Sequence, residues 1–415
     1  MKIMNNAIIS GLDIGNGYVK GRFLGIDGKP VNIDIPSCVA GLANLPGVRD
    51  EANDEFVNDI FNRMICTIKS PAVAESRHIL FGGTSISSGR SLTEFDIAAS
   101  SFSKAQQDLS GILVLGSVAG SAIRNYWATN HSMPVDVLPV TVVCALALPI
   151  DEYMVHRTEF ASKFMSHEHE VIIENFEQTV VVRIRFASVN VLPEGVSAQY
   201  AIAGKGEGFM QALLNDVRKH DANALAGITA KDLVECRNTC GIDIGEGTVN
   251  LPVITDGRFN VVASTTLQKG YGTVLEQSLD AVRVAHMPYD TRKALADMLQ
   301  KPVTPFTKKK QQTVRDIVNV EATDLVNDIV RQVSKVLASG GVDVIYVYGG
   351  GATPMKDALY TPLMDMSMEY SGGDAFPILY LDSSYARNLN REGLFTVAMA
   401  DYEKFVSEQK ETKSK

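Results

Sequence analysis

A short glycine-rich segment near the start of the chain recurs in its second half. The pattern Gly-x-Asp-Ile-Gly-x-Gly-x-Val begins at Gly11 and again at Gly241. In both copies an apolar stretch follows, then an Asp-Gly pair (Asp27-Gly28 and Asp256-Gly257), then another apolar stretch. An Asp-Gly pair in this setting is typical of a tight β-hairpin turn. Each copy therefore predicts strand, glycine-rich turn, strand, turn and strand, which indicates one domain plan used twice.

The other segments divide into apolar runs and helix-period patterns. Strands are predicted for Gly111–Gly116, for Val135–Leu148, for a hairpin within Val171–Asn190 and for Val342–Tyr348. Helices are predicted near Phe56–Ile68, for Ser117–Asn130, Lys205–Lys219 and Ala230–Arg237, for one long helix over Thr313–Ala338 that ends at Gly340-Gly341, and from about Pro354. The polar tail after Lys404 is expected to fray.

Composition excludes several classes of function. The net charge of −9 and the pI near 5.4 argue against a direct, sequence-independent grip on DNA, which needs clustered Lys and Arg. Five widely spaced cysteines fit reduced thiols better than a disulfide framework. No run approaches the roughly 18 apolar residues that cross a bilayer. We therefore expect a cytoplasmic protein that reaches DNA, if at all, through a partner.

The repeated Asp-x-Gly-x-Gly turns fit the chemistry of phosphate binding. Glycine lets a backbone come close to a phosphate and point N–H groups at its oxygens. Asp13 and Asp243 end the preceding strands, and a carboxylate there would repel phosphate unless it held a hydrated divalent cation. Lys20 follows on the next strand of the first copy and can add positive charge. A single such turn is usually only a turn, but two aligned copies favour phosphate binding.

The familiar nucleotide-binding patterns do not fit these turns. A dinucleotide-binding fingerprint needs Gly-x-Gly-x-x-Gly opening a helix, whereas Gly15-Asn16-Gly17 leads into an alternating, strand-like run. No Walker A pattern occurs in the chain. A third turn, Gly349-Gly350-Gly351, lies between a predicted strand and a predicted helix and would let the backbone approach a flat ring or a ribose.

Taken in order, the three turns resemble the phosphate-1, phosphate-2 and adenosine motifs of the actin-like superfamily, which includes actin, sugar kinases, chaperone ATPases and bacterial actins. Pro193-Glu194-Gly195 ahead of the second phosphate motif looks most like the ParM/StbA plasmid-segregation group. The resemblance covers most of the chain. It implies an α/β, ribonuclease H-like fold of two duplicated domains with a nucleotide cleft between them.

The resemblance also implies roles for individual residues. Glu194 would orient the attacking water, and Asp13 and Asp243 would hold hydrated Mg²⁺ and help to position that water. The remaining residues would contact ATP or ADP: Gly15, Asn16, Gly17 and Lys20 at the β- and γ-phosphates, Gly245, Gly247 and Thr248 on the other side of the phosphates, Lys269 and Gly270 at the ribose, and Gly349, Gly350 and Gly351 at the adenosine. Glu246 departs from the small residue of many relatives and is expected to point away from phosphate.

Domain boundaries and function follow from the same resemblance. Domain I would comprise residues 1–239, with a polar subdomain at about 30–110 and a C-terminal return at about 381–415, and domain II would comprise residues 240–380. The implied function is an ATPase that polymerises into filaments and segregates plasmid DNA through a DNA-binding adaptor protein. Two alternatives stay open: a small-molecule kinase of the same fold, and a cell-division scaffold that binds ATP without hydrolysing it.

Three other residue groups have simpler interpretations. His167 and His169 have a conceivable metal spacing, but their acidic context favours a solvated turn. Cys236 and Cys240 lack the second pair of ligands that a zinc site needs. Lys308-Lys309-Lys310 is interpreted as the solvated start of a helix, with a filament contact as the lesser alternative.

Overall fold

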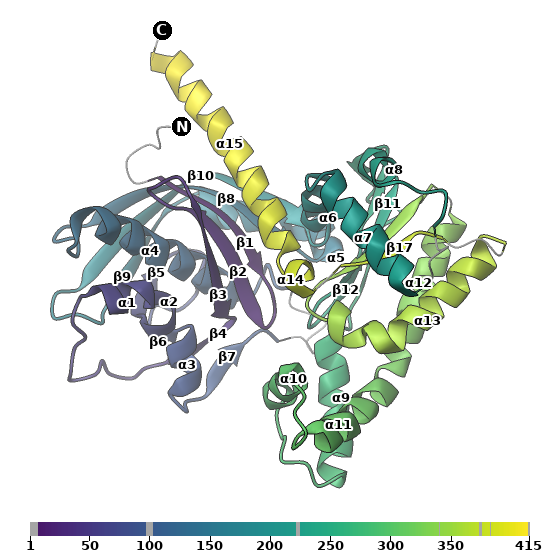
Figure 1. Ribbon diagram of the computed structural model, residues 1–415. Coiled ribbons are helices and arrows are strands. Elements are labelled where there is room, and N and C mark those ends of the chain that lie inside the picture. Colours follow the sequence, from purple (N-terminus) through teal and green to yellow (C-terminus); the bar gives the residue numbers. More distant parts are fainter. Residues whose placement is uncertain are drawn as a thin grey trace. The chain divides into compact units, whose positions relative to one another are not determined.

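The computed structural model describes residues 7–96, 103–220, 225–339, 341–372, 376–381 and 383–413. The chain forms two compact units, residues 1–193 with 390–415, and residues 194–389. Figure 1 shows the elements of both units. The predicted domain boundaries at 239/240 and 380/381 were drawn from motif positions and stay a prediction.

Unit 1 is built on a ten-stranded sheet in the order β3-β2-β1-β8-β10-β9-β5-β6-β4-β7. Its strands are β1 (Ala7–Ile14), β2 (Tyr18–Leu24), β3 (Pro30–Pro36), β4 (Cys38–Gly41), β5 (Ile65–Lys69), β6 (His78–Phe81), β7 (Leu92–Glu94), β8 (Leu138–Leu148), β9 (Glu168–Ile173) and β10 (Val180–Pro193). Strand β1 pairs antiparallel with β2 and parallel with β8, which in turn pairs parallel with β10. The helices are α1 (Asp54–Asn58), α2 (Ile60–Arg63), α3 (Gly83–Ser87), α4 (Asp108–Asn130), α5 (Ile150–Met165) and α15 (Leu389–Lys413).

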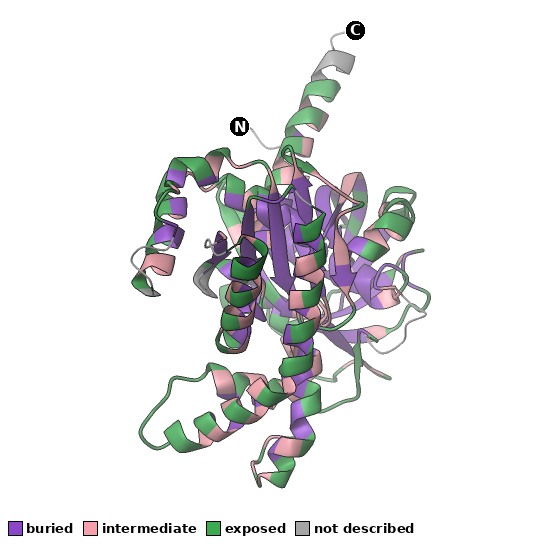
Figure 2. Cartoon of the chain, turned by 90° about the vertical axis from the view of Figure 1, so that its right-hand side faces the viewer, coloured by how far each residue is buried: buried purple, intermediate pink, exposed green. Residues whose placement is uncertain are grey.

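Alternating side chains of the central strands of unit 1 enter two different cores. Leu12 of β1 and Val142 of β8 pack in a core with residues of α4 and α5. Ile9 and Val143, on the other face of the same strands, pack against Tyr402 of α15. Helices therefore cover both faces of the sheet (Figure 1). This explains why β1 and β8 are buried nearly throughout and why they read as continuous apolar runs. Figure 2 shows buried residues in purple on strands and exposed residues in green along many helices.

Unit 2 repeats this plan on a seven-stranded sheet. Its strands are β11 (Thr239–Ile244), β12 (Val249–Leu251), β13 (Val253–Thr255), β14 (Arg258–Phe259), β15 (Thr265–Leu267), β16 (Val344–Tyr348) and β17 (Ile378–Tyr380). Strand β11 pairs antiparallel with β12 and β13 and parallel with β16, which pairs parallel with β17. The helices are α6 (Val196–Ala203), α7 (Glu207–His220), α8 (Ala230–Glu235), α9 (Tyr271–Val284), α10 (Arg292–Gln300), α11 (Lys308–Glu321), α12 (Thr323–Ala338), α13 (Ala352–Tyr370) and α14 (Ser383–Ala386).

The sheet of unit 2 is also covered on two faces. Ile345 and Val347 of β16 belong to the core that includes residues of α9 to α13. Tyr346 and Tyr348, which alternate with them, belong to the core that includes residues of α6, α7 and α8. The duplication predicted from the repeat is therefore confirmed at the level of topology, because both units place a glycine-turn hairpin beside two parallel strands.

Both predicted Asp-Gly turns are present. Gly28 has a φ of 77° between β2 and β3, and Asp256 and Gly257 have φ values of 52° and 75° between β13 and β14. The second strand of the repeat differs between the copies, because Pro252 separates β12 from β13 where β2 is continuous. Proline cannot donate a ladder hydrogen bond, which accounts for the interruption.

The prediction of a strand at Gly111–Gly116 was wrong, because these residues lie inside α4. The helix is buried on all sides from Leu109 to Ile123, so it shows no amphipathic period. Its glycines fit close neighbours: a Cβ on Gly116 would lie 2.4 Å from the ring of Phe81, and one on Gly120 would lie 2.5 Å from the ring of Phe61.

Three helix predictions also need correction. The segment Phe56–Ile68 forms the short helices α1 and α2 and then enters strand β5. The long helix over Thr313–Ala338 is two helices, α11 and α12, which meet at Ala322; Gly340 of its predicted end lies outside the described residues. The tail after Lys404 is helical to Lys413, as part of α15. Within the described part of the chain, no helix is long and apolar enough to span a membrane.

Candidate functional site

The first glycine turn joins β1 to β2 in unit 1. The Gly15 N–H donates to the carbonyl of Tyr18 at 3.0 Å, and a Cβ on Gly15 would lie 2.8 Å from that same oxygen. Ser37 supports the turn from outside, since its hydroxyl donates to the Gly15 carbonyl at 2.6 Å and its N–H to the Gly17 carbonyl at 2.9 Å. The turn is therefore held by hydrogen bonds to the carbonyls of both of its glycines.

Asp13 and Lys20 lie opposite each other on the two strands of this hairpin. They are paired in the β1–β2 register, and Lys20 Nζ lies 3.9 Å from Asp13 Oδ2. The carboxylate is almost fully buried, and Lys20 is partly buried. Charges of both signs thus lie next to the glycine turn, and the roles of Asp13 and Lys20 toward a hydrated cation and phosphate stay a prediction.

The second glycine turn, between β11 and β12 in unit 2, has the same hydrogen bond. The Gly245 N–H donates to the Thr248 carbonyl at 2.9 Å, and a Cβ on Gly245 would lie 3.1 Å from that oxygen. Asp243 precedes the turn, is 5% exposed, and is paired in register with Asn250. The two copies of the repeat therefore build the same local geometry, with an amide in the second copy where the first has the ammonium of Lys20.

The Glu194-Gly195 turn, which joins β10 to α6, packs against Asp243 at Gly195. Gly195 has a φ of +79°, and a Cβ there would lie 3.3 Å from Asp243 Cβ and 2.8 Å from the ring of Pro252. Tyr348 of β16 fixes the turn, because its hydroxyl donates to the Gly195 carbonyl at 2.7 Å. The sequence prediction named Glu194 and Asp243 separately, and unit 2 brings their backbones together.

Glu194 is buried and accepts a hydrogen bond from an amide. Asn250 Nδ2 donates to Glu194 Oε2 at 2.9 Å, and Asn250 Oδ1 accepts from the hydroxyl of Thr266 at 2.8 Å. The exposed fractions of Glu194, Asn250 and Thr266 are 8%, 1% and 8%. Buried polar groups are stable only when they are hydrogen-bonded, so these two bonds fix the orientation of the carboxylate.

The third glycine turn, between β16 and α13, contacts the second. Gly349 has a φ of +96°, and a Cβ there would lie 2.5 Å from Asp243 Oδ1. The Gly351 N–H donates to the Ile244 carbonyl at 2.8 Å. A Cβ on Gly350 would meet nothing within 4 Å. Gly349 and Gly351 are therefore needed for close packing onto β11, while Gly350 faces open space.

The segment predicted to line the ribose also packs on the second turn. Gly272 donates its N–H to the Glu246 carbonyl at 2.8 Å, and a Cβ on Gly270 would lie 2.4 Å from that oxygen. Lys269 is paired with Asp328 of α12 at 2.9 Å. The Glu246 carboxylate is turned toward Arg292 of α10, with Nη1 and Oε1 3.8 Å apart. The negative charge of Glu246 therefore lies near the positive charge of Arg292.

Burial shifts the pKa of two tyrosines near these turns. Burial, and after it the nearby carboxylate of Asp243, raises the pKa of the Tyr348 hydroxyl well above its ordinary value. The hydroxyl therefore stays protonated and can keep donating to Gly195. Burial also raises the pKa of Tyr271, the first residue of α9, to about 12.

The described side chains form no direct metal cage. Among the described residues, no three His, Cys, Asp or Glu side chains gather where they could together hold a metal ion. Mg²⁺ commonly keeps several waters and binds through one or two carboxylates and substrate phosphates. The buried carboxylates of Asp13 and Asp243 fit that mode of binding.

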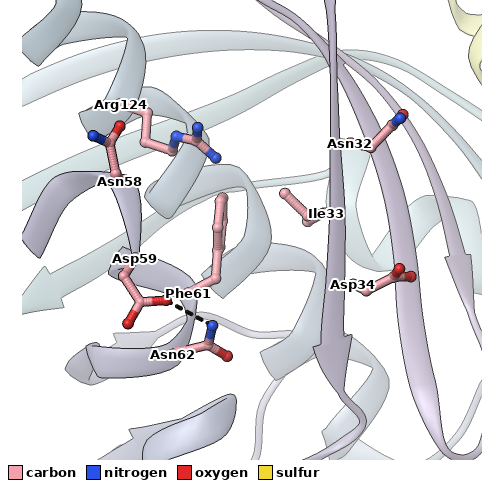
Figure 3. A pocket seen from close by; sticks show the side chains of 8 residues that line it. All are labelled: Asn32, Ile33, Asp34, Asn58, Asp59, Phe61, Asn62 and Arg124. Atoms are coloured by element: carbon pink, nitrogen blue, oxygen red, sulfur yellow. Dashed lines mark hydrogen bonds between the residues drawn. The ribbon is translucent and has the colours of Figure 1, made fainter. Parts of the chain in front are cut away.

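A pocket of about 160 Å³ lies elsewhere in unit 1, between β3 and the helices α1, α2 and α4 (Figure 3). None of the predicted site residues lines it. Arg124 lies over the ring of Phe61, with its guanidinium carbon 5.8 Å from the ring centroid. Asp59 at the rim accepts a hydrogen bond from Asn62 at 2.8 Å. The pocket is therefore separate from all three glycine turns of the sequence analysis.

One of the simpler sequence interpretations was wrong. His169 is in strand β9, not in a solvated turn, and it is completely buried. Its Nε2 bonds the Phe164 carbonyl at 2.9 Å and its Nδ1 bonds the Ser70 hydroxyl at 2.7 Å. His167 is exposed. Cys236 and Cys240 are free thiols, and Lys308–Lys310 open helix α11 as predicted.

Comparison with family models by sequence gives one match in each half of the chain. A family model described as the N-terminal domain of actin-like proteins matches residues 11–196. A model described as the C-terminal part of archaeal MreB-like actin homologues matches residues 241–361. The chain is an actin-like protein. No curated protein matches this actin-like chain by sequence.

Solved structures share the fold over nearly the full length. ParM of Bacillus thuringiensis with ATP is 17% identical, covers 96% of this chain and 100% of its own, and has a TM-score of 0.60. The apo psk41 ParM protein is also 17% identical, with coverage of 96% and 99% and a TM-score of 0.55. The archaeal actin homologue Ta0583 is 15% identical, with coverage of 95% and 99% and a TM-score of 0.58. The predicted actin-like α/β fold, and the resemblance to ParM at the level of fold, are confirmed.

Sequence reasoning missed three residues around Glu194. Asn250 and Thr266 form its hydrogen-bond chain, and Tyr348 holds its turn. The repeat places Asn250 at the position of Lys20, but this alignment does not point to a contact with Glu194. Thr266 and Tyr348 come from other strands, and nothing in the linear pattern links them to Glu194.

Proposed function

We propose that this actin-like protein binds ATP with Mg²⁺, hydrolyses it, and uses the nucleotide state to control its assembly into filaments that segregate plasmid DNA. The observation that carries the proposal is the convergence in unit 2 of Glu194, Asp243 and Gly349, which lie far apart in the sequence. ParM of Bacillus thuringiensis, which shares the fold, has been crystallised with ATP, ADP and AMPPNP.

The two glycine turns would contact one triphosphate. In each turn the N–H of the first glycine closes the turn next to a buried aspartate, so N–H groups of the following residues would be the donors to phosphate, and the first turn adds the Lys20 ammonium. Backbone donors and a lysine suit the β- and γ-phosphate oxygens. Gly350, whose Cα faces open space, would let the adenosine approach the start of α13. These are the roles given to Gly15, Asn16, Gly17, Gly245, Gly247 and Thr248 in the sequence analysis.

Glu194 would orient the attacking water. Phosphoryl transfer needs mainly positioning and charge neutralisation, so one carboxylate held in a fixed direction suffices for that step. The hydrogen bond from Asn250 holds the carboxylate in place and leaves it an acceptor. A bound Mg²⁺ would neutralise charge on the phosphates, and Asp13 and Asp243 would hold its water ligands.

Filament formation and plasmid segregation are extended to this chain from its resemblance to the ParM group. The acidic net charge supports an indirect link to DNA through a basic, DNA-binding adaptor. Loss of the γ-phosphate would remove contacts made by the two turns, so subunit affinity would depend on nucleotide state.

Phosphate release and sedimentation test the proposal together. The wild-type protein should release phosphate from ATP and should pellet on ultracentrifugation with ATP more than with ADP or without nucleotide. Glu194→Gln keeps the size of the side chain and should lower turnover about a hundredfold or more, since a positioned base contributes at least that much. It should still bind ATP, and its pellet should persist longer than that of the wild type.

Other outcomes would favour the alternative functions. Phosphate transfer that depends on an added sugar or carboxylic acid would indicate a kinase. A scaffold would be indicated if the wild-type protein bound ATP tightly and Glu194→Gln left the rate of ATP hydrolysis unchanged. Protein that stays in the supernatant under all three nucleotide conditions would contradict the filament proposal.

A further inference from the structure

A buried chain of two hydrogen bonds ends on the Glu194 carboxylate. Thr266 of β15 donates to Asn250 Oδ1 at 2.8 Å, and Asn250 of β12 donates from Nδ2 to Glu194 Oε2 at 2.9 Å. The same Nδ2 makes a longer contact of 3.4 Å with the Thr248 hydroxyl. Thr266, Asn250 and Glu194 are each less than one-tenth exposed. Water therefore has little access to replace either bond, and each group depends on its neighbour.

The orientation of the Asn250 amide follows from its two partners, because the Glu194 carboxylate can only accept and selects the Nδ2 end, while the hydroxyl of Thr266 donates to Oδ1. An amide has a donor end and an acceptor end of nearly the same shape, and its hydrogen-bond partners select the orientation. A hydroxyl that donates to Oδ1 leaves Nδ2 directed at Glu194. If the amide turned over, its oxygen would face the carboxylate, and two acceptors would repel each other.

The repeat shows that this position differs between the two copies. Asn250 is the register partner of Asp243, just as Lys20 is the register partner of Asp13. A lysine at position 250 would bring a positive charge against Glu194 and compete with water for its carboxylate. A neutral amide can hold the carboxylate in place without neutralising it.

We propose that Asn250 is a positioning residue for ATP hydrolysis, and that Thr266 holds the Asn250 amide in place through its hydrogen bond to Oδ1. The inference rests on the proposed function, because it assigns a task to residues that support Glu194. Asn250 touches Glu194, and the proposal places neither Asn250 nor Thr266 in contact with the nucleotide. Both residues should therefore affect the rate of the chemical step far more than the binding of ATP.

Steady-state ATP hydrolysis by four variants of the full chain tests this proposal. Asn250→Ala should lower kcat about tenfold, the loss expected for one hydrogen bond to a charged group, while KM for ATP stays within about twofold. Thr266→Val, which keeps the shape and removes the hydroxyl, should lower kcat by roughly threefold or more. Thr266→Ser, which restores the hydroxyl, should keep the wild-type kcat. Asn250→Ala combined with Glu194→Gln is the fourth variant.

The combined variant separates positioning from a general loss of structure. If Asn250 acts through Glu194, adding Asn250→Ala to Glu194→Gln should lower kcat no further, because interacting residues are not additive. The proposal would be overturned if Asn250→Ala lowered kcat by the same factor in the Glu194→Gln variant as in the wild type. It would also be overturned if Thr266→Val and Thr266→Ser had equal kcat values. A wild-type protein that hydrolyses ATP and slows with Glu194→Gln, but not with Asn250→Ala, would overturn this inference alone. No hydrolysis by the wild type would overturn it together with the proposed function.

Discussion

At the residue scale, Gly349 and Gly350 are neighbours with opposite surroundings. A Cβ on Gly349 would lie 2.5 Å from Asp243 Oδ1, and its φ of +96° disfavours any side chain. A Cβ on Gly350 would meet nothing within 4 Å. Gly349→Ala should therefore lower stability by about 2 kcal/mol or more and displace Asp243. Thermal unfolding should show a lower Tm for Gly349→Ala and a nearly unchanged one for Gly350→Ala; equal Tm values would contradict this packing.

Lys20 provides a second test at this scale. Its ammonium lies 3.9 Å from Asp13 behind the first glycine turn, and we assign it to the terminal phosphates. Lys20→Gln should weaken ATP binding about tenfold or more, because a charge-assisted contact is lost. AMP lacks those phosphates, so its affinity should hardly change. Isothermal titration with both nucleotides measures the contrast, and equal losses for ATP and AMP would argue that Lys20 does not contact the terminal phosphates.

The sequence was most informative where one residue type has a specific physical use. Glycines at a turn and a carboxylate at the preceding strand end favour phosphate binding when the pattern occurs twice, so Asp13, Asp243 and their turns were predictable. Asn250 and Thr266 were not, because Asn and Thr are common in strands and loops. Their significance comes from tertiary contacts with Glu194, which no local pattern encodes.

At the element scale, helix α15 is the last segment of unit 1 and was expected to fray in its second half. Tyr402 of this helix is completely buried in a core with Ile9 and Val143, whereas Glu403 is exposed. Tyr402→Ala should cost about 3–5 kcal/mol of stability, the range found for large-to-small changes in a core. In chemical denaturation, the unfolding midpoint of Tyr402→Ala should lie at a lower denaturant concentration, whereas that of Glu403→Ala should hardly change. Equal midpoints for the two variants would mean that α15 does not pack against the sheet of unit 1.

Strand β9 provides a pH-dependent prediction. Burial, above all, lowers the pKa of His169, so the folded protein favours the neutral ring. The stability gained from a neutral His169 is present above its unfolded pKa of about 6.5 and is lost as pH falls below that value. His169→Gln should therefore reduce the loss of stability between about pH 7 and pH 5. The exposed His167→Gln is the matched control and should follow the wild type; a wild-type slope in His169→Gln would contradict the assignment.

Helix α4 shows why some elements escaped prediction. The spacing of apolar residues distinguishes a helix from a strand only when one face of the element is polar. Helix α4 is buried on every side over most of its length. Its apolar run was therefore taken for a strand. The central strands β1 and β8 are equally buried, but they were short or ended at proline, and their prediction was correct.

At the scale of the whole molecule, the duplication made the fold predictable from sequence. Two copies of one pattern implied two copies of one sheet plan, and both units have a glycine-turn hairpin followed by parallel strands. Family models match the two parts separately, and solved actin-like structures share the fold at 15–19% identity. Positions that only orient a neighbour, such as Asn250, lie outside what such patterns can predict.

Isothermal titration of ATP and Mg²⁺ into the wild type and into single-turn variants tests most directly whether both turns hold the same nucleotide. Gly15→Ala and Gly245→Ala each place a methyl group against the carbonyl that closes one turn, 2.8 Å from Tyr18 O and 3.1 Å from Thr248 O. We predict one ATP per wild-type chain and loss of most of the affinity in each variant. The Tm should fall in Gly15→Ala and fall less in Gly245→Ala, and circular dichroism at the titration temperature should show that both variants are folded. Two independent sites per chain, or wild-type affinity in either variant, would contradict the account.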